Sequence, residues 1–212
     1  MSISEKIQNI KKVLPNHVHL VVVSKNQSNS KIMEVYRSGH RIFGENKVQE
    51  LVEKYETLPK DIKWHMIGHL QSNKVKYIAP FVDLIHSVDS KKLLKEINKR
   101  AFQNNRIIDC LLQIHIAVEK TKFGLSENDV NEILSVKNQY KNINIKGLMG
   151  MATFTNNRTQ IKEEFNYLLN IFNKYKVLKT LSMGMSGDYK IAIECGSNLI
   201  RIGSSIFETS NY

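Results

Sequence analysis

The sequence predicts an α/β fold: a single (β/α)8 barrel of the TIM type. Short runs rich in β-branched and other apolar residues alternate with longer stretches that have helical periodicity. The first four runs begin at Leu20, Ile42, Trp64 and Leu84, a spacing of 20–22 residues. That spacing accommodates one strand and one short helix in each unit. Four further runs bring the number of predicted strands to eight, as the barrel requires.

The predicted strands follow from their apolar, β-branched composition. They span residues 20–23, 42–44, 64–68, 84–88, 110–116, 146–150, 180–184 and 199–203.

Helical periodicity fills the gaps between these strands. A first helix is predicted over residues 4–14. Ser90 and Ser126 are the expected N-caps of two later helices, and Asp129 completes a capping pattern with Ser126. The apolar stripe at positions 165, 168, 169 and 172 has the i, i+3, i+4, i+7 spacing of one helix face.

A doubly wound open sheet is the alternative, because it shares the same strand and helix alternation. The chain contains neither G-x-G-x-x-G nor the phosphate-loop pattern G-x-x-x-x-G-K-[ST], which weakens that alternative. No linker rich in Pro, Gly or Ser interrupts the pattern. We therefore expect residues 1–212 to form one barrel domain.

The composition is that of a globular protein, with 42% hydrophobic and 24% charged residues among 212. The net charge of +11 is the difference between 31 basic and 20 acidic residues, and only 6 of the basic residues are Arg. Proteins that read nucleic-acid bases usually favour Arg, so we expect a solvated lysine-rich surface and no nucleic-acid partner. A phosphate-bearing ligand would also suit the positive field.

Location is predicted from what the chain lacks. It shows neither a secretory signal nor an apolar run of about 20 residues, the length needed to cross a bilayer. The two cysteines, Cys110 and Cys195, are far apart and form no metal-binding pattern, which fits a reducing compartment. We expect a cytoplasmic monomer with no membrane partner.

In a barrel of this type, functional residues follow the carboxyl ends of the strands. Lys25 directly follows the first strand, where a lysine could either condense with an aldehyde or remain a solvated strand-end residue. Asn46 follows the second strand and offers a donor and an acceptor to a planar ligand, or it simply belongs to a turn.

His65 and His69 lie four residues apart, but no Glu accompanies them as in zinc proteases, so we expect no metal site. We expect His65 to be either a hydrogen-bonded residue of the barrel or a residue that lies behind those contacting a ligand.

Two loops rich in small residues follow the seventh and eighth strands, at residues 183–188 and 201–205. Each is expected to open a helix with free backbone N–H groups, a favourable place for an anion. Barrel phosphate sites are frequently made by these two loops. Together they predict a phosphate site, although each loop alone could be an ordinary helix cap.

Six motifs in this order resemble the single-domain pyridoxal 5′-phosphate homeostasis proteins, which are related in fold to the N-terminal domain of alanine racemase. The motifs are residues 22–25 (VVSK), 44–50 (GENKVQE), 64–74 (WHMIGHLQSNK), 122–125 (KFGL), 182–188 (SMGMSGD) and 201–204 (RIGS). The resemblance covers essentially the whole chain, and the block at 64–74 is the most specific.

The resemblance implies a cofactor, pyridoxal 5′-phosphate (PLP), and a role for each matching residue. Lys25 would form the Schiff base, and Asn46 would lie beside the cofactor ring. Arg201 would face the pyridine nitrogen. The phosphate-binding positions are Ser186, Gly203 and Ser204, where the family often has Thr in place of Ser204.

The resemblance leaves open whether the protein is an enzyme. An arginine at the pyridine nitrogen disfavours the protonated ring, which makes the ring a poorer electron sink. Racemases of this fold also use a tyrosine from a second domain, and only nine residues follow Gly203 in this sequence. We therefore expect a binding protein that holds PLP, takes part in its intracellular homeostasis, and supplies it to PLP-dependent apo-enzymes without efficient catalysis. The alternative is a weak PLP-dependent amino-acid racemase.

Overall fold

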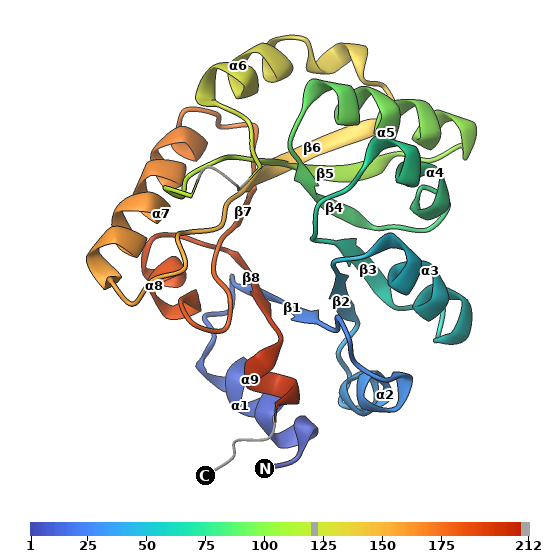
Figure 1. Ribbon diagram of the computed structural model, residues 1–212, viewed down its shortest axis with the longest axis vertical. Coiled ribbons are helices and arrows are strands. Elements are labelled where there is room, and N and C mark those ends of the chain that lie inside the picture. Colours follow the sequence, from blue (N-terminus) through green and yellow to red (C-terminus); the bar gives the residue numbers. More distant parts are fainter. Residues whose placement is uncertain (120–122, 209–212) are drawn as a thin grey trace.

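The computed structural model describes residues 1–119 and 123–208, and over these residues the strands close into a parallel barrel (Figure 1). Neighbouring strands pair in sequence order, and β1 pairs with β8 to close the ring, with His19 opposite Leu199. The strands are β1 His19–Val23, β2 Ile42–Glu45, β3 Lys63–Met66, β4 Leu84–Val88, β5 Ile108–Gln113, β6 Ile143–Met149, β7 Thr180–Ser182 and β8 Leu199–Ile202. The predicted barrel is confirmed.

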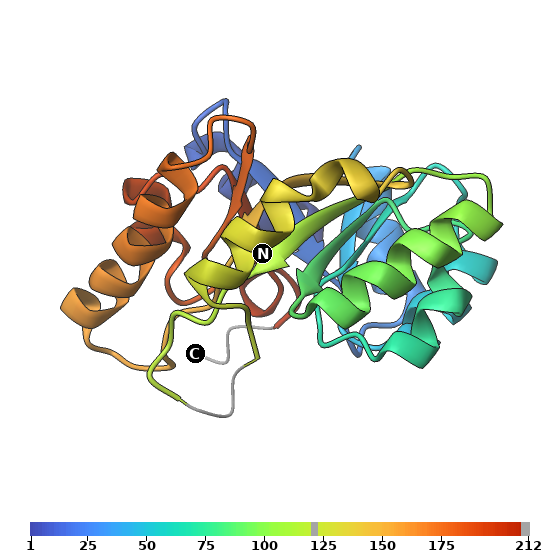
Figure 2. The same cartoon turned by 90° about the horizontal axis from the view of Figure 1, so that it is seen from above.

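Helices surround the ring of strands on the outside (Figures 1 and 2). The α-helices are α1 Ile3–Val13, α2 Asn29–Arg37, α3 Val48–Thr57, α4 Val75–Ile78, α5 Lys91–Gln103, α6 Glu127–Ser135, α7 Arg158–Asn173, α8 Tyr189–Glu194 and α9 Ser204–Phe207. Short 3-10 helices occur at η1 Ser72–Lys74 and η2 Lys137–Gln139. Helices α1 and α9 lie side by side, so the first and last helices meet beneath β1 and β8. None of the helices in the described residues is long and apolar enough to cross a membrane.

The expected helix caps are present. The Ser90 hydroxyl accepts a hydrogen bond from the Leu93 amide at 3.2 Å, at the start of α5. Ser126 and Asp129 form a reciprocal capping box at the start of α6. Each satisfies backbone N–H groups that the first helical turn leaves without a partner. These local signals explain why the helix starts were readable from the sequence.

The strands alternate between two environments, because successive side chains point to opposite faces. One face packs under the helices in a large apolar core whose biggest members are Trp64, Phe43 and Phe165. The other face points into the barrel, where a smaller cluster includes Val21, Leu111 and Met149. Several polar side chains share that interior, as described below.

The strand limits differ from prediction by up to three residues. β3 and β7 each end two residues before their predicted limits, β5 begins two residues early, and the differences of three residues are at the end of β5 and the start of β6. β5 ends at Gln113 and not at position 116, because the chain leaves the barrel there and Ile114 bridges to Leu125. β6 begins at Ile143, three residues before the predicted start, because its first part is only partly buried and lacks a continuous apolar run.

Candidate functional site at the carboxyl end of the barrel

The six residues that the sequence singled out line one cavity at the carboxyl ends of the strands. The cavity has a volume of about 720 Å³, within the range of small-molecule sites. The six residues follow or end four strands, β1, β2, β7 and β8, and they are Lys25, Asn46, Ser186, Arg201, Gly203 and Ser204.

Lys25 lies in a turn immediately after β1. The following residue, Asn26, has φ of 57°, in the left-handed region that asparagine tolerates better than most residues. The Lys25 side chain is exposed, and no residue of the described ranges forms a hydrogen bond or ion pair with its amino group. The amine is therefore accessible to a ligand in the cavity.

A buried polar network lies beneath this turn. The Lys54 ammonium donates hydrogen bonds of 2.7 Å to the Ser24 carbonyl oxygen, to Glu45 Oε1 and to Glu50 Oε1, so all three of its donors are used. Glu45 Oε1 also accepts a hydrogen bond of 2.6 Å from the Ser24 hydroxyl. Burial raises the pKa of Glu45, and the hydrogen bonds from Lys54 and Ser24 oppose that rise. Sequence reasoning missed the network, since the i, i+4 pair of Glu50 and Lys54 resembles an ordinary helix-surface pair.

Asn46 follows β2 and lies against the end of β3. A Cβ atom on Gly68 would come within 2.4 Å of the Asn46 carbonyl oxygen, so only glycine fits at position 68. The two chain segments can therefore approach closely enough to bring half-buried Asn46 to the cavity wall.

Arg201 projects from β8 into the barrel and is only 3% exposed. Its Nη1 donates to the carbonyl oxygen of Ser182 at 3.1 Å and to the Ser182 hydroxyl, and its Nη2 donates to the Gly150 carbonyl oxygen at 3.1 Å. All three acceptors are neutral. Burial lowers the pKa of Arg201 to about 10, so the guanidinium remains charged at pH 7. The negative charge of Asp188 opposes this lowering of the pKa. A buried cation whose hydrogen bonds go to neutral oxygens favours an electron-rich group in the adjoining cavity.

The two loops expected to bind phosphate meet at the cavity. The Ser186 hydroxyl accepts a hydrogen bond from the Gly203 amide at 3.3 Å, which joins the loop before α8 to the loop before α9. Space is open around Gly187, where a Cβ atom would have no neighbour within 4 Å. Gly203 packs on Val23 at the end of β1, where a Cβ atom would lie 3.0 Å from the Val23 carbonyl oxygen. The loops thus place hydroxyl and backbone N–H donors opposite the strand that leads to Lys25.

The cavity also contains residues that sequence reasoning did not assign. The ring of His69 stacks on Phe123, with centroids 4.3 Å apart, and the Phe123 carbonyl oxygen accepts a hydrogen bond from Gln113 Nε2 at 2.7 Å. Phe123 belongs to the motif at 122–125, whose Lys122 lies outside the described residues. No sequence pattern signalled this stack, because it joins two loops from different units of the barrel.

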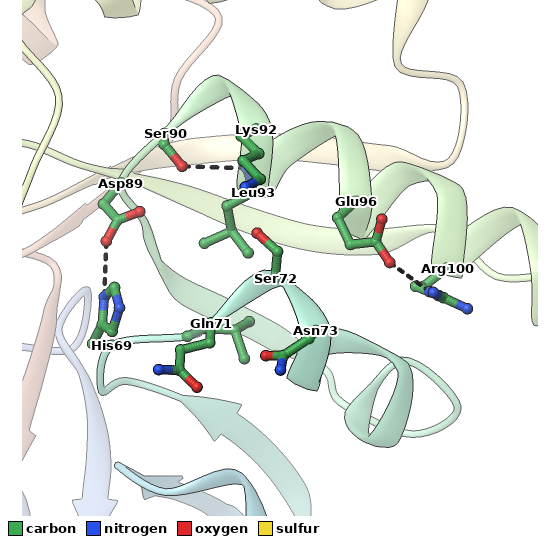
Figure 3. A pocket seen from close by; sticks show the side chains of 11 residues that line it. His69, Gln71, Ser72, Asn73, Asp89, Ser90, Lys92, Leu93, Glu96 and Arg100 are labelled. Carbon is green, nitrogen blue, oxygen red and sulfur yellow. Dashed lines mark hydrogen bonds and ion pairs between the residues drawn. The ribbon is translucent and has the colours of Figure 1, made fainter.

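His69 separates the cavity from a second hollow, of about 680 Å³, between η1 and the start of α5 (Figure 3). Its Nδ1 lies 3.0 Å from Asp89 Oδ2, as the dashed line in Figure 3 marks. His65, in contrast, points into the barrel and its Nδ1 lies 3.0 Å from His86 Nε2, as expected for a hydrogen-bonded residue of the barrel. Within residues 1–119 and 123–208, no three His, Cys, Asp or Glu side chains are grouped as metal ligands.

The sequence of this chain is similar to one family model and to several known proteins. The family model for the alanine racemase N-terminal domain matches residues 1–211. The pyridoxal phosphate homeostasis protein of Aquifex aeolicus is 39% identical over 203 residues, which cover 93% of this chain and 89% of that protein. Its counterpart from Helicobacter pylori strain 26695 is 38% identical, over 96% and 94% of the two chains.

Solved structures give the same picture. PipY of Synechococcus elongatus, determined with PLP bound, is 33% identical and superposes with a TM-score of 0.89 over 97% of this chain and all of that one. An alanine racemase of Clostridium difficile superposes with a TM-score of 0.80 at 13% identity, and the match covers 57% of its length. The second likeness shows the fold alone.

Proposed function

Because this chain belongs to the alanine racemase N-terminal domain family, and within it to the pyridoxal phosphate homeostasis proteins, we propose that it binds pyridoxal 5′-phosphate in the barrel cavity and takes part in intracellular PLP homeostasis. The observation that carries the proposal is the convergence of the six expected residues on that cavity. The relative with PLP bound, PipY, supports it through its similarity over nearly the whole chain.

Lys25 is the proposed attachment point. Its amine is free of hydrogen bonds from the described residues and lies in the cavity. The Lys25 amine would hold the cofactor's aldehyde by reversible condensation, with one water lost on binding and taken up again on release. Reversibility suits a protein that stores a reactive aldehyde and later releases it.

The other residues orient the cofactor. Ser186, Gly203 and Ser204 would supply hydroxyl and N–H donors for the phosphate, in the two loops that precede helices α8 and α9. Asn46 would lie beside the cofactor ring. Arg201, fixed by its three neutral acceptors, would face the pyridine nitrogen.

We propose that the protein works as a carrier and not as an efficient enzyme. Bound PLP can stabilise a carbanion next to its C=N bond, and this ability is greatest when the pyridine nitrogen is protonated. The Arg201 guanidinium, which has no proton-accepting lone pair, opposes that protonation. Its acceptors are backbone and hydroxyl oxygens, so no carboxylate counteracts the effect among these three contacts. The predicted outcome is a low rate of racemisation.

The remaining expectations complete the proposal. Residues 1–212 act as one domain and as a monomer in the cytoplasm, and PLP-dependent apo-enzymes receive the cofactor. Both cysteines, Cys110 and Cys195, are buried and free, which supports function in a reducing compartment.

The test is to load the purified protein with PLP, record the visible spectrum, reduce with borohydride and map the labelled peptide. We expect a yellow protein with one adduct per chain, on Lys25. Lys25→Ala should remain colourless, whereas Lys47→Ala, which alters an exposed lysine outside the cavity lining, should behave like the wild type. An adduct on another lysine, with Lys25 unlabelled, would refute the assignment.

A further inference from the structure

A chain of hydrogen bonds runs through the barrel interior from Arg201 to His65. Arg201 Nη1 contacts the Ser182 hydroxyl, which lies 3.2 Å from His86 Nδ1. His86 Nε2 lies 3.0 Å from His65 Nδ1. All four residues are buried, with exposed fractions of 0–7%. The proposed function uses only Arg201 and its acceptor Ser182, and leaves both histidines without a role.

The direction of the protons follows from the chemistry of the end groups. The guanidinium can only donate, so the Ser182 oxygen accepts from it. His86 is the remaining described partner of that hydroxyl, so its proton is donated to His86 Nδ1. His86 then carries its proton on Nε2 and donates to His65 Nδ1, and His65 carries its own proton on Nε2. The reverse order would leave the Ser182 proton buried without a described acceptor, which is unfavourable.

Electrostatics favour the same direction. Burial lowers the pKa of His65 to about 3 and holds the pKa of His86 well below its usual value, so both rings are neutral at pH 7. Each hydrogen bond in this order directs its proton away from the Arg201 cation. The aligned dipoles reinforce one another in an interior of low dielectric constant.

This chain of hydrogen bonds ends at the opposite mouth of the barrel, away from the cavity that contains Lys25. His65 lines a hollow of about 410 Å³ at the amino ends of the strands, together with Lys63 and Asp109. His65 is 7% exposed and lines this hollow, so its Nε2 proton can be donated to water there. The chain therefore needs no further protein acceptor.

We propose that His86, acting through Ser182, is a positioning residue for Arg201, and that both interior histidines are held as neutral Nε2–H tautomers. Two backbone carbonyls, of Ser182 and Gly150, set the plane of the guanidinium. The Ser182 hydroxyl supplies the third acceptor, and His86 fixes where that hydroxyl points. The relation to the pyridine nitrogen rests on the proposed function, but the tautomers do not.

The first arm of the test uses the full-length protein without PLP. Long-range ¹H–¹⁵N correlation spectra distinguish the two neutral tautomers of each histidine, and His86→Asn and His65→Gln variants assign the signals. We expect protonated Nε2 and unprotonated Nδ1 in both rings at pH 7.5. An Nδ1–H tautomer at either ring would overturn the proposed chain.

The second arm measures the loaded protein. His86→Phe removes the acceptor from the Ser182 hydroxyl, and we expect a changed absorption maximum, a changed ¹⁵N shift of the cofactor's ring nitrogen, and about tenfold weaker binding of PLP. His86→Asn places an amide oxygen near the position of Nδ1, and we expect it to restore most of both spectroscopic values. Cys110→Ala serves as the control for loss of core packing, since that buried thiol is not part of the chain of hydrogen bonds from Arg201 to His65.

The outcomes separate the two proposals. If the wild type does not bind PLP, the proposed function fails, and the tautomers remain decided by the first arm. If the wild type binds PLP but His86→Phe leaves the spectrum and the ring-nitrogen shift unchanged, the positioning role fails. Equal changes in His86→Phe and Cys110→Ala would also refute it, because they would report packing alone.

Discussion

Glu50 Oε1 accepts a hydrogen bond of 2.6 Å from the backbone amide of Asn26, the residue that follows Lys25. The same oxygen accepts from the Lys54 ammonium, which also holds the Ser24 carbonyl on the other side of Lys25. One buried ammonium thus anchors the backbone before and after the proposed attachment lysine. Charged groups of helix α3 and strand β2 hold the backbone of this turn, while the Lys25 side chain makes no hydrogen bond with the described residues.

Lys54→Met should destabilise the fold strongly, because it leaves the buried Glu45 carboxylate without its cation. We expect the free energy of unfolding to fall by about 3–5 kcal/mol, measured by urea denaturation. The double variant Lys54→Met with Glu45→Met should recover much of that loss. A loss no greater than that of Lys99→Met, on a surface helix, would contradict the network's role.

Ser186→Ala combined with Ser204→Ala should weaken retention of PLP more than either single change, since backbone N–H groups partly compensate for one lost hydroxyl. Each lost charge-assisted hydrogen bond should cost about 1.5–3 kcal/mol of binding free energy. Equilibrium dialysis or spectral titration measures the effect. Unchanged affinity in the double variant would place the phosphate elsewhere.

Arg201→Glu should increase exchange of the α-proton of an amino acid, because a carboxylate at the pyridine nitrogen stabilises its protonated form. Deuterium incorporation into alanine, followed by NMR, compares this variant with the wild type and with Lys25→Ala. We expect negligible exchange by the wild type, which should still transfer PLP to an apo-enzyme.

Two results would change this interpretation. Rapid wild-type exchange over many turnovers would reject the carrier role and support the racemase alternative. If neither protein exchanges while the wild type transfers PLP, the carrier role holds and the argument from Arg201 fails.

His40 gives the fold a specific sensitivity to acid. Burial lowers the pKa of His40 to about 4, from an ordinary value of 6.5, so the unfolded chain binds this proton more readily than the folded one. The contribution of neutral His40 to the free energy of unfolding is fully present above pH 6.5. It is lost as the pH falls from 6.5 toward 4, at about 1.4 kcal/mol per pH unit.

His40→Gln tests this contribution, because an amide N–H can replace the contact between His40 Nε2 and the Ile42 carbonyl oxygen. Between pH 7.5 and pH 5, the variant should lose about 2 kcal/mol less unfolding free energy than the wild type. The other buried histidines are common to both proteins and cancel. Parallel curves of stability against pH would show that His40 titrates normally.

Much of the fold was readable from the sequence because its signals are local. Each β-branched run predicted a strand, and Ser90 and Ser126 marked helix starts that their own neighbours satisfy. The largest errors fell at the end of β5 and the start of β6, where a bridge from Ile114 to Leu125 and a partly buried strand depend on distant segments. Local composition carries no information about such pairings.

The sequence by itself predicted the barrel and the order of its strands, which places every carboxyl end on one side. The resemblance of its motifs to a known family then named the six residues expected at that mouth of the barrel. Only the tertiary structure decided how those residues are supported. In the sequence, Lys54 resembles half of an ordinary ion pair on a helix surface, whereas in the structure β2 brings Glu45 against it. In the sequence, His86 is one more strand residue, whereas closure of the barrel brings Ser182 and His65 to its two ring nitrogens. Both contacts join segments far apart in the chain, and burial then gives them an energetic weight that spacing along the sequence does not encode.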